Sequence, residues 1–323
     1  MASVIFGKNL AMHNLSLECH SCKPQESPLV AVLLATFNGL NYLSEQVKSI
    51  YDQIGVDVTI FVSDDFSSDG TWEWLNEHKN DKLVLLPRNQ RFGSASANFF
   101  RLLRDVDISS FDYVALSDQD DIWKSDKLIY SINKISEHKV NAFSSDIIAF
   151  WLDGRKKLIL KSQPQVKWDY IFQSAGPGCT YLFDKTLAKG LGEALRQNFL
   201  NLSNIEFHDW FFYAWARSNG YRWHIDSCPT LYYRQHESNT FGANQGFKAY
   251  RSRLEKLLGE WYRSQILLTV EQINENNFEL LSSLQRLGWW DRLVLVMSVK
   301  NFRRSLSGQI VLAFAFTFMR KEL

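Results

Sequence analysis

The sequence predicts an α/β fold in which short strands alternate with helices along the first half of the chain. Residues 29–35 are a near-continuous apolar run, as expected of a strand buried on both faces of a parallel sheet. Apolar residues then recur at helical spacing from 43 to 54, and a second strand-like run follows at 58–62. This alternation favours a parallel sheet with right-handed crossovers.

The other elements of this half continue the pattern. Asn41 is placed to cap the first helix, and Gly55 to end it. Further segments alternate in the same way: a helix at 72–78, a strand at 83–86, a helix after Gly93, a strand at 113–116 and a helix capped by Ser125. The order is therefore β-α-β-α-β-α-β-α.

The second half is less regular. Residues 143–151 are expected to form one strand, 210–215 an aromatic-rich helix, and the pattern from 247 onward is helical. We expect a flexible extension at 1–27, the main domain at 28–245 and a C-terminal helical region at 246–323.

Composition narrows the class of protein. A net charge of +1 argues against a nucleic-acid partner, which would require a basic face. Four cysteines in 323 residues do not form a disulfide framework, so we expect a reduced, cytoplasmic protein. Cys19 and Cys22 form a C-x-x-C pair, but no second pair at zinc spacing follows, which disfavours metal binding there.

The most informative stretch is 117–123, Ser-Asp-Gln-Asp-Asp-Ile-Trp. Its three carboxylates follow a buried strand, and like charges so close together are costly unless a cation compensates. Oxygen ligands suit Mg²⁺ or Mn²⁺, which commonly bridge to substrate phosphates. The alternative is a solvated acidic turn that caps the next helix.

Two other polar loops, at 36–38 and 64–71, also follow strands of the predicted sheet. Parallel sheets bind ligands beyond the carboxyl ends of their strands, so the three loops are expected to share one rim. Residues 65–70 also mimic the start of a calcium loop, but position twelve is Asn76 rather than Glu, and a strand precedes the loop.

Several motifs in this order resemble the family 2 glycosyltransferases, which have the GT-A fold, a mixed sheet flanked by helices. The resemblance covers about residues 28–245 and rests on the following segments: Ala-Thr-Phe-Asn-Gly at 35–39, Val-Ser-Asp-Asp-Phe-Ser-Ser-Asp-Gly-Thr at 62–71, the acidic stretch, Gly-Cys-Thr at 178–180 and His-Asp-Trp at 208–210. The acidic stretch together with Tyr-Arg-Gln-His at 233–236 resembles the rhamnosyltransferase-like branch that builds bacterial surface polysaccharides.

The resemblance implies roles for the residues that match these motifs. On the donor side, the nucleotide sugar would be bound by Thr36, Phe37, Asn38, Asp64, Asp118 and Arg234. Asp64 would accept the pyrimidine imide N–H, because a carboxylate strengthens such a bond. The metal ligands would be Asp120, Asp118 and His236.

On the acceptor side, the resemblance implies that Asp209 is the general base of an inverting displacement at the anomeric carbon. Trp123, Gly178 and Trp210 would lie near the acceptor.

Structural alternatives remain open for these side chains. Asp209 could have no role beyond capping its helix, and His208 beside it is expected to be structural. Both tryptophans could be core residues, the 176–180 turn could be only a tight connection, and His236 could have no metal role. Asn219-Gly-Tyr-Arg-Trp is similar to the Q-x-x-R-W of processive synthases, but Asn replaces Gln, which favours transfer of one sugar per binding event.

The C-terminal tail contains apolar segments at 293–297 and 310–319, bordered by basic residues and too short to cross a bilayer. Such helices can lie at an anionic membrane surface, or pack on the main domain or on a second subunit of a homodimer.

The resemblance and the acidic stretch therefore predict a metal-dependent inverting glycosyltransferase that is cytoplasmic, with the inner face of the plasma membrane as its location if the C-terminal helices bind lipid. The expected donor is a nucleotide-diphosphate sugar, dTDP-L-rhamnose in this branch, and the expected acceptor is a saccharide or a lipid-linked precursor. The alternatives are a sugar-nucleotide nucleotidyltransferase, whose first loop is usually glycine-rich and basic, and a non-catalytic nucleotide-sugar-binding protein.

Overall fold

The computed structural model describes residues 27–202, 204–236, 255, 257–273, 275 and 278–319. The expected extension at 1–27, which contains Cys19 and Cys22, lies outside the described residues except for residue 27. The expected domain boundary at 245–246 also lies outside them.

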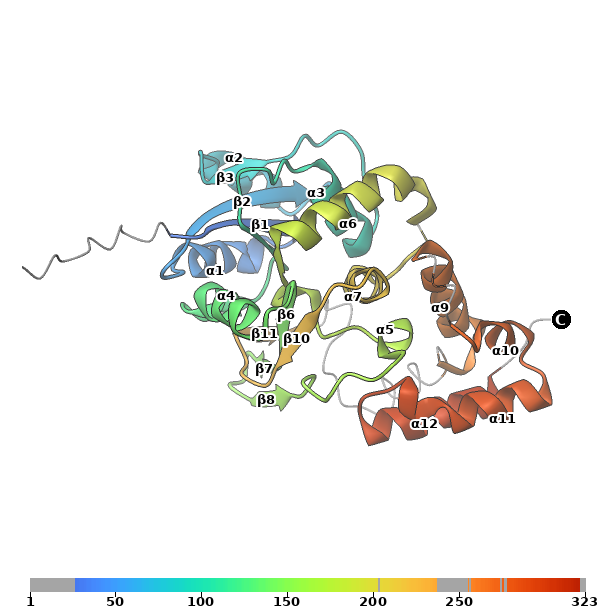
Figure 1. Cartoon of the computed structure of the whole chain (residues 1–323). Coiled ribbons are helices and arrows are strands. Elements are labelled where there is room, and N and C mark those ends of the chain that lie inside the picture. Colours follow the sequence, from blue (N-terminus) through green and yellow to red (C-terminus); the bar gives the residue numbers. More distant parts are fainter. Residues whose placement is uncertain are drawn as a thin grey trace, which may run out of the picture.

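A seven-stranded sheet forms the centre of the molecule, in the order β10-β6-β9-β4-β1-β2-β3 (Figure 1). Its strands are β1 (Leu29–Thr36), β2 (Asp57–Asp64), β3 (Leu83–Leu85), β4 (Tyr113–Ser117), β6 (Ala142–Ser145), β9 (Leu182–Asp184) and β10 (Trp223–Asp226). β1 pairs in parallel with β2 and β4, whereas β9 runs antiparallel to β4 and β6. The sheet is therefore mixed, as the resemblance implied.

Helices cover both faces of this sheet. Val30, Val32 and Leu34 of β1 pack on one side, and Ala31 and Leu33 on the other, so the continuous apolar run serves two cores. The first core takes α1 (Leu40–Tyr51), α2 (Thr71–His78) and α4 (Lys127–His138); the second takes α3 (Ala95–Asp105), α6 (Lys185–Asn198) and α7 (His208–Ser218).

Two predicted helix starts are wrong by one or two residues. The first helix begins at Leu40 with Gly39 at its N-cap, so Asn41 lies inside the helix. The fourth begins at Lys127 with Asp126 at its N-cap rather than Ser125. In neither helix does a side chain of the N-cap residue accept a backbone N–H, so the local capping signal was absent.

A smaller sheet lies below the first, in the order β5-β11-β7-β8. Its strands are β5 (Ile122–Trp123), β7 (Ile147–Trp151), β8 (Lys156–Ile159) and β11 (Leu231–Gln235). The single strand predicted at 143–151 is wrong, because the chain passes from one sheet to the other at Asp146. This buried carboxylate accepts the N–H groups of Lys161 and Ser162 and so holds the chain at the point where it leaves β6.

The C-terminal helices lie on one side of the molecule, away from β1–β3, with α5 (Asp169–Phe172) and α7 nearest to them (Figure 1). They are α9 (Glu260–Gln272), α10 (Leu281–Arg286), α11 (Trp289–Met297) and α12 (Leu306–Phe318). Among the described residues, no helix is long and apolar enough to cross a membrane.

Candidate active site

The three polar loops converge at the carboxyl ends of β1, β2 and β4. Thr36 at the end of β1 is paired with Asp64 at the end of β2, and Leu34 with Ser117 at the end of β4. The strand register therefore brings residues from 36, 64 and 117 onward to one edge of the sheet.

Side-chain hydrogen bonds fix these loops to one another. The Gln119 amide accepts the Phe37 N–H at 2.8 Å and donates to the Phe37 carbonyl at 2.9 Å. The Asn38 N–H donates to the Ser67 hydroxyl, and the Asn38 side-chain oxygen accepts the Ser68 N–H, both at 2.8 Å. The rim is thus one connected surface on which the Phe37 ring remains 42% exposed.

Asp64 is buried and strongly hydrogen-bonded. Its carboxylate accepts the hydroxyls of Thr36 and Ser67 and the Ser67 N–H, and lies 3.1 Å from Nε of Arg88. The carboxylate therefore holds the loop after β2. Its expected bond to a pyrimidine N–H stays a prediction.

Arg88 was missed by sequence reasoning, although it follows the third strand and so lies at the same rim. Its guanidinium lies against the rings of Phe66 and Trp72, with 4.6 Å and 5.1 Å to the ring centroids. Phe66 is 40% exposed and has a positive φ of 60°, so the loop after β2 presents an aromatic ring beside a cation at the rim.

The calcium-loop resemblance at 65–70 has a structural explanation. Asp65 accepts the N–H groups of Phe92 and Gly93, and Asp69 accepts the Leu40 N–H. These carboxylates accept hydrogen bonds from backbone N–H groups of neighbouring segments. The acidic residues of this loop therefore hold the rim together.

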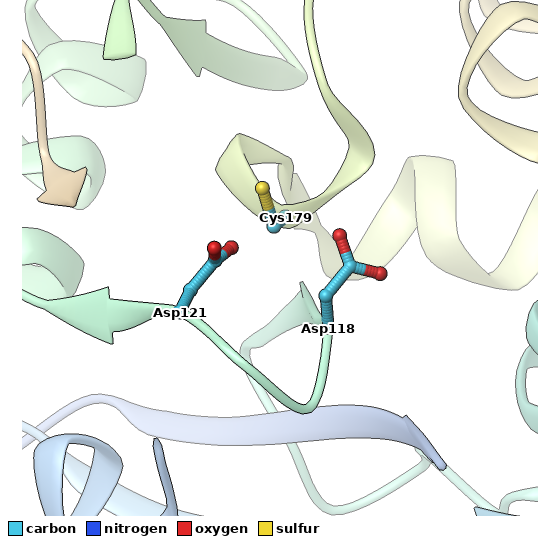
Figure 2. Close-up of side chains that lie close together, drawn as sticks. All are labelled: Asp118, Asp121 and Cys179. Atoms are coloured by element: carbon cyan, nitrogen blue, oxygen red, sulfur yellow. The ribbon is translucent and has the colours of Figure 1, made fainter. Parts of the chain in front are cut away.

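The acidic stretch forms a cluster with a cysteine that sequence reasoning missed. Asp118 and Asp121 lie on the loop between β4 and β5, and Cys179 faces them from the short helix at Gly178–Thr180 (Figure 2). One ligand atom from each of the three residues lies within 4.8 Å of the others. Cys179 belongs to the Gly-Cys-Thr motif, but nothing in the sequence indicated that it lies beside the two carboxylates.

Like charges in this cluster oppose one another. Burial, and then the charges of Asp120 and Asp209, raise the pKa of Asp118 to about 7. Burial, and then Asp120 and Asp118, also raise the pKa of Asp121 well above its usual range. Because the charge of Asp209 raises the pKa of Asp118, the predicted base lies near enough to the acidic cluster to interact with it electrostatically.

The residues of the cluster fit a hard divalent cation. Its carboxylates supply oxygen donors, and one oxygen of the buried Asp121 has no hydrogen-bond partner in the described part of the chain. Burial raises the pKa of the Cys179 thiol well above its usual range, so the neutral thiol is a weak ligand beside the carboxylates.

Two residues at the C-terminal end of β11 and directly after it contact the loop at 118–121. His236 Nε2 lies 2.7 Å from Asp120 Oδ2, and the predicted metal role of both residues stays a prediction. Arg234 is buried; its Nε donates to the Asp120 carbonyl at 2.8 Å, and its guanidinium pairs with Glu45. The predicted contact of Arg234 with the donor diphosphate stays a prediction.

Lys127 is a second residue that sequence reasoning missed. Its side chain is fully buried, its ammonium lies 3.7 Å from the Trp123 ring centroid, and within the described residues it has no hydrogen-bond partner. Burial lowers the pKa of Lys127 to about 8, against the opposing effect of Cys179 and Asp121. It places a positive charge beneath the acidic cluster, and no sequence motif indicated it.

Asp209 occupies the first turn of α7. Its Oδ1 accepts the Trp210 N–H at 2.7 Å, so the helix-capping alternative is partly correct. Burial raises the pKa of Asp209 to about 6, while the Trp210 N–H, the Lys161 charge and the Ser174 side chain act in the opposite direction. Lys161, which sequence reasoning missed, is therefore a cationic neighbour of the predicted base.

The remaining acceptor-side residues have packing roles in this structure. A Cβ on Gly178 would lie 2.4 Å from His208 Nε2, so the turn needs glycine for this close approach. His208 stacks on Phe99 at 4.1 Å, and burial lowers its pKa to about 3, which favours the structural alternative. Trp123 and Trp210 are 3% and 6% exposed, which favours core packing over a sugar-binding surface.

Comparisons with known proteins identify the family of this chain. Residues 31–176 match the family model described as Glycosyl transferase family 2. The dTDP-rhamnosyl transferase RfbG of Shigella flexneri is 39% identical over 280 residues, which are 86% of this chain and 96% of that protein. An Escherichia coli UDP-Glc:alpha-D-GlcNAc-diphosphoundecaprenol beta-1,3-glucosyltransferase, WfaP, is 24% identical over 212 residues, 64% of this chain and 78% of that protein.

The fold has a counterpart among solved structures. S. aureus TarS 1-349 in complex with UDP superimposes with a TM-score of 0.52 at 15% identity, covering 89% of this chain and 88% of that chain. The family match excludes the nucleotidyltransferase and the non-catalytic binding protein expected as alternatives. The chain belongs to glycosyl transferase family 2 and is a glycosyltransferase with the GT-A fold.

Proposed function

We propose that this glycosyltransferase moves L-rhamnose from dTDP-L-rhamnose, with inversion, onto a hydroxyl of a lipid-linked or saccharide precursor of a surface polysaccharide. The observation that carries the proposal is the position of Asp209, whose charge reaches the acidic cluster at Asp118. The donor sugar follows from the relative from S. flexneri, and the lipid-linked acceptor from the E. coli relative.

Asp209 acts as the general base. Its raised pKa of about 6 leaves it mostly ionised at neutral pH and makes it a stronger base than an ordinary carboxylate, so it can accept the hydroxyl proton as the new bond forms. A direct displacement needs one carboxylate on the acceptor side and no covalent intermediate, so the anomeric configuration inverts.

Asp118, Asp120 and His236, the ligands that the resemblance implies, would hold Mg²⁺ or Mn²⁺. Asp121, which lies in one cluster with Asp118, would be a further oxygen ligand. When bound, the cation neutralises charge that develops on the leaving diphosphate. The chain's own contribution is to keep these carboxylates fixed against β1 through the Gln119–Phe37 hydrogen bonds.

The nucleotide would lie along the rim formed by Thr36, Phe37, Asn38 and Asp64. The exposed rings of Phe37 and Phe66 each lie beside an arginine, Arg91 and Arg88 respectively, and offer apolar surface and positive charge to a nucleotide.

Turnover of a panel of nucleotide sugars by the purified chain tests this proposal. We expect dTDP-L-rhamnose to be the best donor, and Asp209→Asn to lower kcat by about 10²–10⁴-fold. Asp52→Asn, which removes an exposed carboxylate paired only with Lys48, is the matched control and should retain full activity. Normal turnover by Asp209→Asn would disprove the assignment of the base.

Metal binding is tested separately by thermal unfolding. We expect Mn²⁺ with dTDP to raise the melting temperature of the wild-type chain by mass action, and Asp120→Ala to remove the metal-dependent part of that rise. An equal metal-dependent rise in Asp120→Ala would show that Asp120 is not a ligand.

We further propose that α11 and α12 rest on the inner face of the plasma membrane. Ten large apolar side chains on these helices are 37–72% exposed: Trp289, Trp290, Leu293, Val294, Met297, Leu306, Ile310, Val311, Phe314 and Phe318. On α12, four of them recur every fourth residue from 306 to 318, while Leu312, Ala315 and Phe316 face the protein. We call these ten side chains the apolar face.

The composition of the apolar face favours lipid over a second subunit as its partner. The two adjacent tryptophans are about 70% exposed, and the exposed Lys300 lies between the two helices. Exposed tryptophans and lysines that border apolar helices are typical of surfaces that meet anionic lipid.

Flotation with anionic phospholipid vesicles tests membrane contact. We expect the wild-type chain to float and the double variant Trp290→Ser/Phe314→Ser to remain in solution. Leu152→Ser, which replaces a 76% exposed leucine on the far hairpin, is the matched control and should float. If the double variant floats normally but changes from dimer to monomer in sedimentation, the apolar face is a subunit interface instead.

A further inference from the structure

Arg304, between α11 and α12, extends from the C-terminal region to the segments beside the proposed base. Arg304 follows the short helix at Val299–Asn301, and its side chain is only 3% exposed. One of its terminal nitrogens donates to Asp169 Oδ2 at 2.9 Å, and the other donates to the Ser174 carbonyl at 2.8 Å. A single guanidinium therefore joins the C-terminal region to two points of the main domain.

The first of these points, Asp169, is a buried carboxylate shared by three segments. It begins α5 and also accepts the Tyr213 hydroxyl at 2.9 Å and an Arg217 N–H at 3.4 Å, both from α7. Because α7 carries Asp209 in its first turn, Arg304 and the helix of the base share one buried anion.

The second point, Ser174, lies beside the proposed base. The Ser174 side chain lowers the pKa of the Asp209 carboxyl group. The neighbouring segment is fixed as well, because the Tyr181 hydroxyl accepts the Ala175 N–H at 3.2 Å and lies 3.1–3.2 Å from the carbonyls of Gly176 and Asp209. Arg304 therefore holds the backbone of the residue whose side chain orients the base.

We propose that Arg304 is a positioning residue for Asp209, acting through Ser174, so that this one side chain couples the C-terminal region to the base. The inference rests on the proposed role of Asp209 as the base. A guanidinium can hold a carboxylate and a carbonyl at once, in a fixed planar geometry that an ammonium cannot reproduce. Displacement of the Ser174 segment by about 1 Å would misplace the base and lower the rate of the chemical step.

The main experiment compares Arg304→Met with Arg292→Met in the full-length chain. Arg292 is the matched control, since its side chain donates to the carbonyls of Leu287, Phe316, Thr317 and Met319, all within the C-terminal region. We expect Arg304→Met to lower kcat by about 10²-fold with an unchanged donor KM, and Arg292→Met to leave kcat near the wild-type value. We expect Arg304→Lys to restore part of kcat.

A double-mutant cycle keeps the inference testable if Arg304→Met is poorly folded. We expect Ser174→Ala to lower kcat by about fivefold, the effect of one lost hydrogen bond. In the Arg304→Lys background the same substitution should have a smaller effect, because both changes act on one link. Additive losses, or a wild-type kcat in folded Arg304→Met, would overturn the inference.

The same assay separates this inference from the proposed function. If Asp209→Asn is inactive and Arg304→Met has normal kcat, Asp209 remains the base and the positioning role is wrong. If Asp209→Asn is active, the assignment of the base itself is wrong, and with it the inference.

Discussion

The rim proposed to bind the nucleotide and the surroundings of Asp209 are built in different ways. The rim comes from the ends of three adjacent strands, and its loops are fixed by residues close to it in the fold, such as Gln119 on Phe37. The surroundings of Asp209 are assembled from Lys161, Ser174 and Arg304, which come from three separate segments. Sheet register determines the first arrangement, whereas the second depends on long-range packing.

The largest effect on stability is expected at the rim, where Asp64 is enclosed by hydrogen-bond donors. Asp64→Asn leaves Arg88 without its buried partner and turns an amide toward those donors, so the free energy of unfolding should fall by about 3 kcal/mol. Chemical denaturation measures this change. Asp52→Asn, the exposed control, should change it by less than about 0.5 kcal/mol, and equal losses would show that the rim is not held by Asp64.

A smaller loss is expected on the acceptor side at Gly178. Gly178→Ala places a Cβ against the His208 ring, so the free energy of unfolding should fall by about 2 kcal/mol. In a His208→Ala background the ring is absent, and the same substitution should cost less than about 0.5 kcal/mol. An equal cost in both backgrounds would mean that another contact requires the glycine.

The smallest effect concerns the pH dependence of the reaction. Because the pKa of Asp209 is about 6 and the base acts when ionised, kcat should fall as the pH drops below about 6. Lys161→Gln removes a charge that lowers this pKa, so the fall should begin at higher pH, by less than about one unit. Measurement of kcat between pH 5 and 8 tests this, and a displacement toward lower pH would contradict it.

Much of the fold and the donor side of the site could be predicted from the sequence. The apolar run at 29–35 predicted a strand buried on both faces, and the strand order then brought Thr36, Asp64 and Asp118 together. Arg88 follows a predicted strand and could have been found by the same reasoning.

The acceptor side could not be predicted in the same way. The break at Asp146 depends on the N–H groups of Lys161 and Ser162, which lie 15 and 16 residues away. The buried position of Lys127 and the path of Arg304 to Ser174 depend on tertiary packing, which overrides any local pattern. From the sequence, Trp123 and Trp210 could equally have been surface or core residues. Their burial in the structure favours the core.

Asp146 has a consequence for how the chain tolerates changes in length. It fixes both the start of β7 and the return of the chain at Lys161, while the hairpin tip between β7 and β8 carries the 76% exposed Leu152. Extra residues inserted at that tip would extend into solvent without shifting Lys161 relative to Asp209. The tip is therefore a suitable place to attach a fluorophore or an affinity tag to the working enzyme.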